Sequence, residues 1–242
     1  MAWTQTSEVD GGIYRWAELP VKISHDRESR KIMEGSSPYF DYLEMHATTQ
    51  YRGAVPNPPH KQQDIEEIII VKEGLMRFTM NGHDAVLGPG SVILIPPLAM
   101  QALENIGDSS LTYYVIMFRS RKPMDMARSD GAGGYLFVDA DTITFSENSK
   151  GGRWNYLDRP TAMCEHLHIH TTQLNEFGPS IPAHSHPESE LFIVMEGQTE
   201  LMIDEQKFLG QAGDLYLVKP GQLHGMSNAS DAPCRFFAIK WK

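Results

Sequence analysis

The sequence predicts an all-β protein made of two similar halves. Short apolar runs rich in β-branched and aromatic residues recur along the chain, bounded by Gly, Pro or Asn, as in E-E-I-I-I-V (66–71) and L-F-I-V-M (191–195). Such runs are too short for typical helices but have the length of strands. The halves also repeat each other, because Glu67 and Glu190, like Gly74 and Gly197, lie 123 residues apart. A repeat of this length is a whole domain and not a solenoid unit.

The chain divides into an N-terminal arm (1–20), a first half (21–124) and a second half (125–242). Trp3, Tyr14 and Trp16 are candidate anchors for the arm. The segment 119–134 contains a proline and three glycines among mixed charges, which indicates a linker with one short helical turn. We expect the strand after this linker to lead the second half.

Turn signals support the strand assignment in both halves. Asn-Gly (81–82) separates M-R-F-T-M from D-A-V-L, which is a strong signal for a two-residue hairpin. Asp-Glu (204–205) occupies the equivalent position in the second half.

The composition agrees with a soluble globular protein. The chain has 242 residues, 41% of them hydrophobic, and a formal net charge of −10. This balance argues against nucleic acid or an anionic membrane as the main partner. No apolar run is long enough for a membrane-spanning helix, and the first ten residues lack a signal-peptide pattern. We therefore expect a cytoplasmic protein, with a removed leader as the alternative, and buried free thiols at Cys164 and Cys234.

Four side chains of the second half form a candidate metal-ligand set. His184, His186 and Glu190 lie within seven residues, and His224 follows 34 residues after Glu190. Because alternate residues of a strand share a face, the first three can point into one cavity. Three imidazoles and one carboxylate suit a divalent transition metal such as Fe, Mn, Ni, Cu or Zn.

These residues resemble the two motifs of the cupin superfamily. The first motif, G-x5-H-x-H-x3-E-x6-G, fits 178–197 without a mismatch. The second, G-x5-P-x-G-x2-H-x3-N, fits 213–228 except that its proline stands one position late, at Pro220. The resemblance implies a bicupin: two tandem jelly-roll (double-stranded β-helix) barrels, with the metal inside the second. It also implies that the N-terminal arm is exchanged between the barrels.

The first half lacks most of this ligand set. A constant shift of 123 places three residues opposite the three imidazoles, namely Lys61, Gln63 and Gln101. Only Glu67 is kept, and strand parity puts His60 on the opposite face. Since lysine and amides are poor ligands for a divalent ion, we predict a metal-free first barrel. A compensating site built from His60 and Glu66 is the alternative.

Further residues are candidates for roles around the metal. Glu188 is a candidate general base, and Arg159, which has no arginine counterpart in the first half, is a candidate for holding an acidic substrate. Phe192 and Met226 follow the ligands at alternate positions and are expected to form an apolar wall of the substrate pocket.

Three further histidines alternate along one strand, at 166, 168 and 170. Same-face neighbours on a strand lie roughly 6.6–7 Å apart, so the three cannot converge easily on one ion. We expect a solvent-facing stripe or stacking against the neighbouring sheet, with one of the three reaching the pocket; a second metal site or a proton relay is the alternative.

The ligand set leaves one or two positions open on a five- or six-coordinate ion, as a catalytic metal requires. The resemblance implies either a dioxygenase or a sugar isomerase or uronate-opening enzyme acting on a small polar molecule. A non-catalytic cupin that binds or senses a small molecule is the alternative. A homodimer is compatible with the exposed strand edges.

Overall fold

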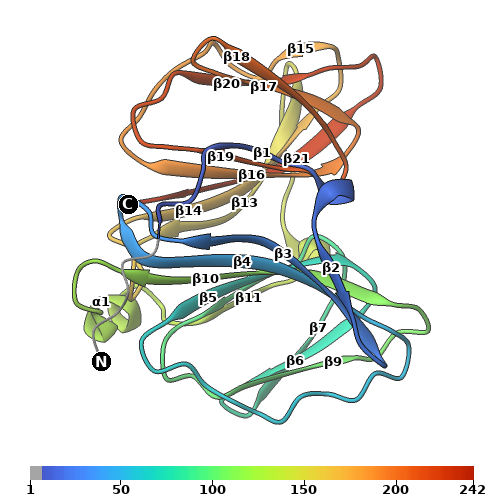
Figure 1. Ribbon diagram of the computed structural model, residues 1–242, viewed down its shortest axis with the longest axis vertical. Helices are drawn as coiled ribbons and strands as arrows, with labels where there is room; N and C mark the ends of the chain where they lie inside the picture. Colours follow the sequence, from blue (N-terminus) through green and yellow to red (C-terminus); the bar gives the residue numbers. More distant parts are fainter. Residues whose placement is uncertain (1–6) are drawn as a thin grey trace. The chain divides into compact units, whose positions relative to one another are not determined.

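The computed structural model describes residues 7–242, so the start of the N-terminal arm, residues 1–6, lies outside the described residues, and with it the candidate anchor Trp3. Contacts divide the chain into two compact units. The first holds the described residues up to Val9, Pro20–Thr142 and Pro160–Met163; the second holds Asp10–Leu19, Ile143–Arg159 and Cys164–Lys242. The main change between units falls after Thr142, whereas the sequence placed it near residue 125. Both units consist mainly of antiparallel strands, which confirms the all-β prediction (Figure 1).

The first unit contains two sheets. A seven-stranded sheet has the order β11-β8-β5-β10-β4-β3-β2, and a three-stranded sheet has the order β7-β6-β9. The strands are β2 (Val21–Ile23), β3 (Arg27–Gly35), β4 (Phe40–Gln50), β5 (Glu66–Glu73), β6 (Met76–Met80), β7 (His83–Leu87), β8 (Val92–Ile95), β9 (Gln101–Asn105), β10 (Leu111–Ser120) and β11 (Leu136–Val138). The short helix α1 (Met126–Gly131) and the 3-10 turn η2 (Ala140–Thr142) complete the unit.

The second unit repeats this plan. Its seven-stranded sheet has the order β1-β19-β16-β21-β14-β13-β12, and its four-stranded sheet the order β15-β20-β17-β18. The elements are β1 (Gly12–Tyr14), η1 (Trp16–Glu18), β12 (Ser146–Asn148), β13 (Gly151–Arg159), β14 (Leu167–Leu174), β15 (Gly178–Pro179), β16 (Ser189–Glu196), β17 (Gln198–Ile203), β18 (Gln206–Gln211), β19 (Leu215–Val218), β20 (His224–Asn228) and β21 (Cys234–Trp241). No helix within residues 7–242 is both long enough and apolar enough to cross a membrane.

Each unit has two sheets (Figure 1), and residues of both sheets supply one buried apolar cluster. Alternate residues of the central strands supply it, as expected for sheets with one face packed on a core. In the second unit the cluster includes Phe192, Val194, Tyr216, Met226 and Phe236. The parity of these residues therefore identifies which side chains of β16, β20 and β21 face the inside of the barrel.

Tight turns confirm the hairpin predictions and explain two repeated glycines. Asn81 and Gly82 have φ values of 49° and 83°, the left-handed pair that a type I′ turn between β6 and β7 needs. Gly74 and Gly197, which follow equivalent strands, have φ values of 87° and 74°. A Cβ atom at either glycine would lie 2.5 Å or 2.4 Å from a backbone carbonyl oxygen, so both positions exclude other residues.

Two short strands, β1 and β11, pair with the edges of the large sheets, and the sequence did not predict these pairings. β1, from the N-terminal arm, pairs with β19 of the second unit, and the backbone N–H of Trp16 donates to Asp214 Oδ1 at 2.8 Å. β11 pairs with β8 of the first unit, so the prediction that the strand after the linker leads the second half was wrong. The edge of β8 has backbone donors and acceptors that need a partner, and β11 supplies that partner from within the first unit.

Candidate metal centre

Backbone pairing sets His184 and His224 side by side. The two residues form an antiparallel bridge, in which each backbone N–H donates to the other residue's carbonyl oxygen at 2.9 Å and 2.8 Å. Opposite residues in such a pair project to the same face, so the imidazole centroids lie 4.6 Å apart. His224 opens β20 and is 1% exposed.

His186 and Glu190 complete the cluster from a loop and from β16. The carbonyl oxygen of His186 accepts a hydrogen bond from Gly221 N at 2.9 Å, which fixes the loop beside β20. Glu190 is 3% exposed and shares the inward parity of Phe192. Its Oε2 lies 3.0 Å from His186 Nε2 and 3.0 Å from His224 Nε2. The structure thus brings the four predicted ligands together.

The outer nitrogens of two imidazoles are held by backbone carbonyls. His224 Nδ1 lies 2.9 Å from the carbonyl oxygen of Gln222, and His186 Nδ1 lies 3.2 Å from that of Glu188. Because a carbonyl only accepts, both Nδ1 atoms must carry the proton. In the neutral imidazoles each Nε2 is then a lone-pair atom aimed at a carboxylate oxygen. That contact is repulsive unless the rings are protonated or a cation lies between the three atoms.

The separations match those of ligands that share one ion. A candidate ligand atom from each of His184, His186 and His224 lies within 4.8 Å of the others. Nitrogen and oxygen ligands bind divalent transition metals at about 2.0–2.2 Å, so two ligands at right angles around one ion lie about 3 Å apart. The Nε2–Oε2 distances of 3.0 Å agree with this value. The residues therefore fit a divalent metal.

The cluster perturbs the proton affinities of its members. Burial alone would raise the pKa of Glu190, but hydrogen bonds from His186 and His224 and the charge of Lys240 outweigh it and lower the pKa to about 2. Burial works against protonation of His224, yet the bond to Glu190 raises its pKa. Burial, with the neighbouring His224, lowers the pKa of His184. The carboxylate is thus ionised at neutral pH, as a metal ligand must be.

Lys240 is a site residue that sequence reasoning missed. It lies on β21 directly opposite Glu190, and its Nζ is 3.6 Å from Glu190 Oε1, the oxygen that does not contact the imidazoles. Phe236 and Ala238 share its parity and belong to the barrel core. That parity was the signal in the sequence, because it places a lysine inside an apolar barrel. The ammonium holds Oε1 and leaves Oε2 directed at the imidazoles.

His168 and His170 also face the inside of the barrel. In register, His168 lies opposite Lys240, and His170 lies opposite Ala238. Their ring centroids are 4.7 Å apart, and burial lowers the pKa of His170 to about 3, so this imidazole is neutral. His166 instead bonds Asp158 Oδ1 through Nε2 at 2.7 Å. The expectation of a solvent-facing stripe was wrong for His170, which is 5% exposed, and the rings of His168 and His170 are tilted by 34° relative to each other.

Glu188 lies behind His186. One carboxylate oxygen pairs with Lys242 Nζ at 3.0 Å, and the other lies 3.5 Å from His186 Nδ1. Burial alone would raise the pKa of Glu188, but the hydrogen bond from Lys242 outweighs it and the pKa lies below the usual value. Glu188 is thus an ionised group on the outer side of the cluster.

The remaining predicted residues divide between the barrel interior and the other face of the sheet. Phe192 and Met226 belong to the buried core cluster, and the Phe192 ring centroid lies 6.4 Å from that of His224. Arg159 is the last residue of β13 and pairs with Leu167 of β14, which in turn pairs with Trp241 of β21. Trp241 is adjacent to the inward-facing Lys240 and therefore has the opposite parity. Arg159 thus projects from the opposite face of the sheet to Glu190. The structure does not bring Arg159 to the cluster.

The first barrel corrects the alignment of the two halves. His60 forms an antiparallel bridge with Gln101, the counterpart of the His184–His224 bridge. The equivalent shift in this segment is therefore 124, and His60 and Gln62, not Lys61 and Gln63, face the interior. The first half has one residue more between this bridge and Glu67, which reverses the parity on which the prediction rested. The first barrel thus keeps one imidazole and the carboxylate, with Gln62 and Gln101 replacing the other two imidazoles.

Glu66 does not join His60 in a compensating site. It accepts hydrogen bonds from the side chain of Thr161 and the backbone of Met163, at 2.5 Å and 3.0 Å. Its inward neighbour Glu67 lines the cavity instead.

Fold and cluster together define a protein of two β-barrels with a histidine–carboxylate cluster in the second. Residues 48–117 and 170–240 each match the family model of the cupin domain, which covers more than half of the chain. The chain belongs to the cupin family, and the two matches make it a bicupin.

Solved bicupin-like structures share the fold at low sequence identity. E. coli Ylba is 13% identical, with 95% of this chain and 90% of that chain covered and a TM-score of 0.73. The Lactobacillus farciminis oxalate decarboxylase formate complex is 12% identical, with coverages of 97% and 87% and a TM-score of 0.73. A Bacillus subtilis oxalate decarboxylase, described with Mn(II) centers, is 12% identical, with coverages of 96% and 77% and a TM-score of 0.68. A comparison with curated protein sequences gives no match.

Proposed function

We propose that the second barrel binds one divalent transition metal through His184, His186, Glu190 and His224, and that the protein is an enzyme acting on a small polar molecule at this metal. One observation carries the proposal. Two imidazole Nε2 atoms lie 3.0 Å from the same carboxylate oxygen, while backbone carbonyls hold their Nδ1 atoms. Carbonyl partners of this kind are typical of metal-binding histidines, because they direct the Nε2 lone pair at the ion.

The donor set favours manganese or iron over the other candidates. Three nitrogens and one oxygen, without a thiolate, suit a borderline to hard divalent ion that accepts further oxygen ligands. The Mn(II) centers of the similar B. subtilis protein support manganese as the first metal to test. When bound, such an ion would polarise an oxygen atom of the substrate as a Lewis acid.

The protein's own side chains would select and hold the substrate. Lys240 places a positive charge inside the barrel, 3.6 Å from Glu190 Oε1, and so favours a substrate with a carboxylate or another anionic oxygen. Phe192 and Met226 form an apolar wall beside His224 that limits the access of water. Glu188 keeps His186 in place from its outer side and acts as a positioning residue. Arg159 has no part in this proposal, since it lies on the other face of the sheet.

Metal content tests the first part of the proposal. We expect one metal per chain in the protein supplied with Mn(II) or Fe(II), measured by elemental analysis after removal of free ions. His224→Ala should lose the metal, whereas Gln101→Ala, the matched change in the first barrel, should keep it. Two metals per chain, or an unchanged content in His224→Ala, would contradict the assignment.

Turnover tests the second part. The metal-loaded protein would be offered small hydroxy, keto and enol acids, with oxygen consumption followed by electrode and proton exchange followed by NMR in D2O. Oxygen consumption that stops when Zn(II) replaces the native metal identifies a dioxygenase. Exchange or isomerisation without oxygen identifies the second class. Binding of these acids without any product would show that the protein is a binding module and refute the enzyme assignment.

A further inference from the structure

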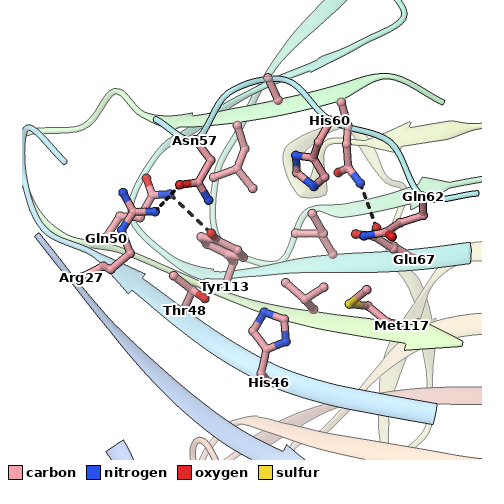
Figure 2. A pocket seen from close by; sticks show the side chains of 15 residues that line it. Arg27, His46, Thr48, Gln50, Asn57, His60, Gln62, Glu67, Tyr113 and Met117 are labelled. Carbon is pink, nitrogen blue, oxygen red and sulfur yellow. Dashed lines mark hydrogen bonds between the residues drawn. The ribbon is translucent and has the colours of Figure 1, made fainter. Parts of the chain in front are cut away.

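The first barrel contains a cavity of its own. Its volume is about 220 Å³, and polar side chains lie at both of its ends with apolar side chains between them (Figure 2). The lining consists of Arg27, His46, Thr48, Gln50, Asn57, His60, Gln62, Glu67, Ile69, Gln101, Ala102, Leu103, Tyr113, Val115 and Met117. The volume is below the roughly 300–1,000 Å³ of pockets for drug-sized ligands, so an occupant has only a few carbon atoms.

At one end, amides replace the imidazoles of a metal cluster. Gln101 Nε2 donates to Glu67 Oε1 at 3.0 Å. The side chain of Gln62 lies beside the same carboxyl group (Figure 2). Glu67 is 4% exposed. Burial raises its pKa, although the amides oppose this. The carboxyl group can therefore accept a hydrogen bond or, when protonated, donate one.

At the other end, a buried amide lacks part of its hydrogen bonding. Gln50 is 1% exposed, and its Nε2 donates to Tyr113 Oη at 3.4 Å. Its Oε1 is buried without a hydrogen-bond partner in the described part of the chain. A buried polar atom left unpaired costs about 1–3 kcal/mol. With the amide turned over, its nitrogen would be the unpaired atom, so either orientation leaves one amide atom of this cavity-lining residue without a partner in the described part of the chain.

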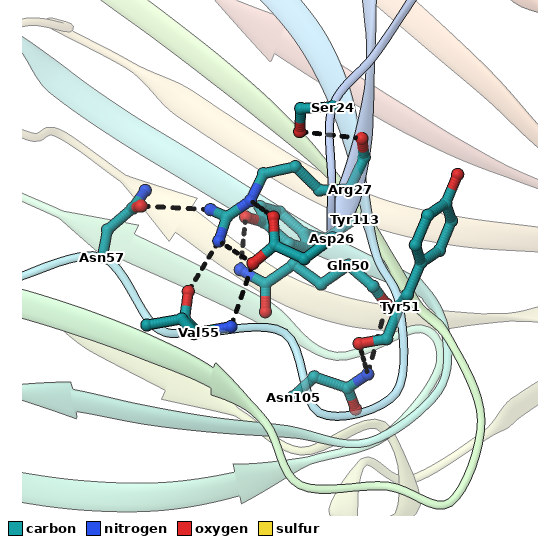
Figure 3. A network of polar contacts seen from close by, with 9 residues as sticks. All are labelled: Ser24, Asp26, Arg27, Gln50, Tyr51, Val55, Asn57, Asn105 and Tyr113. Carbon is teal, nitrogen blue, oxygen red and sulfur yellow. Dashed lines mark hydrogen bonds and ion pairs between the residues drawn. The ribbon is translucent and has the colours of Figure 1, made fainter.

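The single cation at this end is already neutralised. The Arg27 guanidinium donates to both oxygens of Asp26 at 2.9 Å and 3.0 Å, to the carbonyl of Val55 at 2.6 Å and to Asn57 Oδ1 at 3.0 Å (Figure 3). The backbone of Gln50 is fixed as well, since its carbonyl accepts from Asn105 Nδ2 at 3.2 Å (Figure 3). This end is rigid and carries no net charge for an anionic ligand to neutralise.

We propose that the first barrel is a metal-free binding site for a small uncharged polyol. A hydroxyl group both donates and accepts, so it can satisfy Gln50 in either amide orientation and Glu67 in either protonation state. Carbon atoms of the same molecule would contact Ile69 and Val115 between the two ends. An anionic ligand would bring a second negative charge to Glu67, and a cationic one would find no free carboxylate among residues 7–242 at the Gln50 end, because Asp26 is already paired with Arg27.

Saturation-transfer NMR on the full-length protein tests this proposal. The probes are erythritol and xylitol, with D-xylonate and ethanolamine as charged counterparts, each at roughly 10 mM to detect millimolar dissociation constants. We expect transfer to at least one neutral polyol and weaker or no transfer to both charged probes. Gln50→Leu should weaken polyol binding at least tenfold, and Val115→Phe, which fills the cavity, should abolish it. His224→Ala should leave polyol binding unchanged, because it alters only the second barrel.

Each outcome decides the matter. Absence of transfer to both polyols, or stronger binding of a charged probe, would overturn the proposal. Loss of polyol binding in His224→Ala would move the binding to the metal centre instead. Circular dichroism of each variant shows that it is folded, and if Val115→Phe fails to fold, Gln50→Leu and the charged probes still decide the result.

Discussion

Glu66 provides a test of the energetics of the first unit. Its side chain is fully buried at the start of β5, where it accepts hydrogen bonds from Thr161 Oγ1 at 2.5 Å, Met163 N at 3.0 Å and Ala162 N at 3.3 Å. Residues 160–163, which follow β13, belong to the first unit through such contacts. We predict that Glu66→Gln flattens the pH dependence of stability.

The magnitude follows from the proton affinity of the buried group. Burial raises the pKa of Glu66 from 4.5 to about 7, and the hydrogen bonds only partly oppose it. The folded state therefore binds the proton more tightly than the unfolded state. The resulting stability is fully present below pH 4.5 and is lost as the pH rises through about 7. Since one pH unit corresponds to about 1.36 kcal/mol, the full loss is about 3 kcal/mol.

Urea denaturation at pH 5 and pH 8 measures the effect. Between these values the wild-type protein should lose about 2–3 kcal/mol of unfolding free energy that Glu66→Gln does not lose. Glu104→Gln, which changes a half-exposed carboxylate of the same unit, is the matched control and should keep the wild-type slope. Equal slopes in the wild type and in Glu66→Gln would refute the reasoning.

Two further predictions concern the repeated turn and the metal-site lysine. Gly74→Ala and Gly197→Ala should each lower the unfolding free energy by more than about 1 kcal/mol, because φ is positive and the Cβ atom meets a carbonyl oxygen. Gly82→Ala, with a positive φ but open space around the Cβ position, should cost less; thermal denaturation compares the three, and equal losses would contradict the role of the contact. Lys240→Met should weaken formate binding to the Mn(II)-loaded protein about tenfold or more, because a charge-assisted contact contributes about 1.5–3 kcal/mol. Formate titrations followed by Mn(II) EPR would show this, and unchanged affinity would remove Lys240 from the ligand pocket.

The fold and the ligand cluster were predictable because their signals are local. His184, His186 and Glu190 lie within seven residues and share strand parity, so the sequence alone predicts that the three side chains point into one cavity. His224 could be added because residues 213–228 match the second motif, and the structure places it at the start of β20, which pairs with β17. The repeated positions Glu67 and Glu190 then identified two copies of one fold, as the two cupin matches confirm.

The errors came from features that depend on pairing between distant strands. One extra residue before Glu67 reversed the faces assigned to His60 and Lys61, and only the bridge to Gln101 reveals it. Arg159 lies on the opposite face to Glu190 because β13 contains a register shift between Asn155 and Leu157. Such a bulge changes which residues face inward, and no turn residue marks it in the sequence.

The short strand β1 has a practical consequence for anyone dissecting this protein. A gene fragment that begins at residue 125 would encode all four candidate ligands but would omit Gly12–Tyr14, the segment that pairs with β19. The truncated product would expose the backbone of β19, an edge on which other chains can add. Expression of the second barrel alone therefore calls for grafting residues 10–19 onto the fragment or supplying them as a peptide.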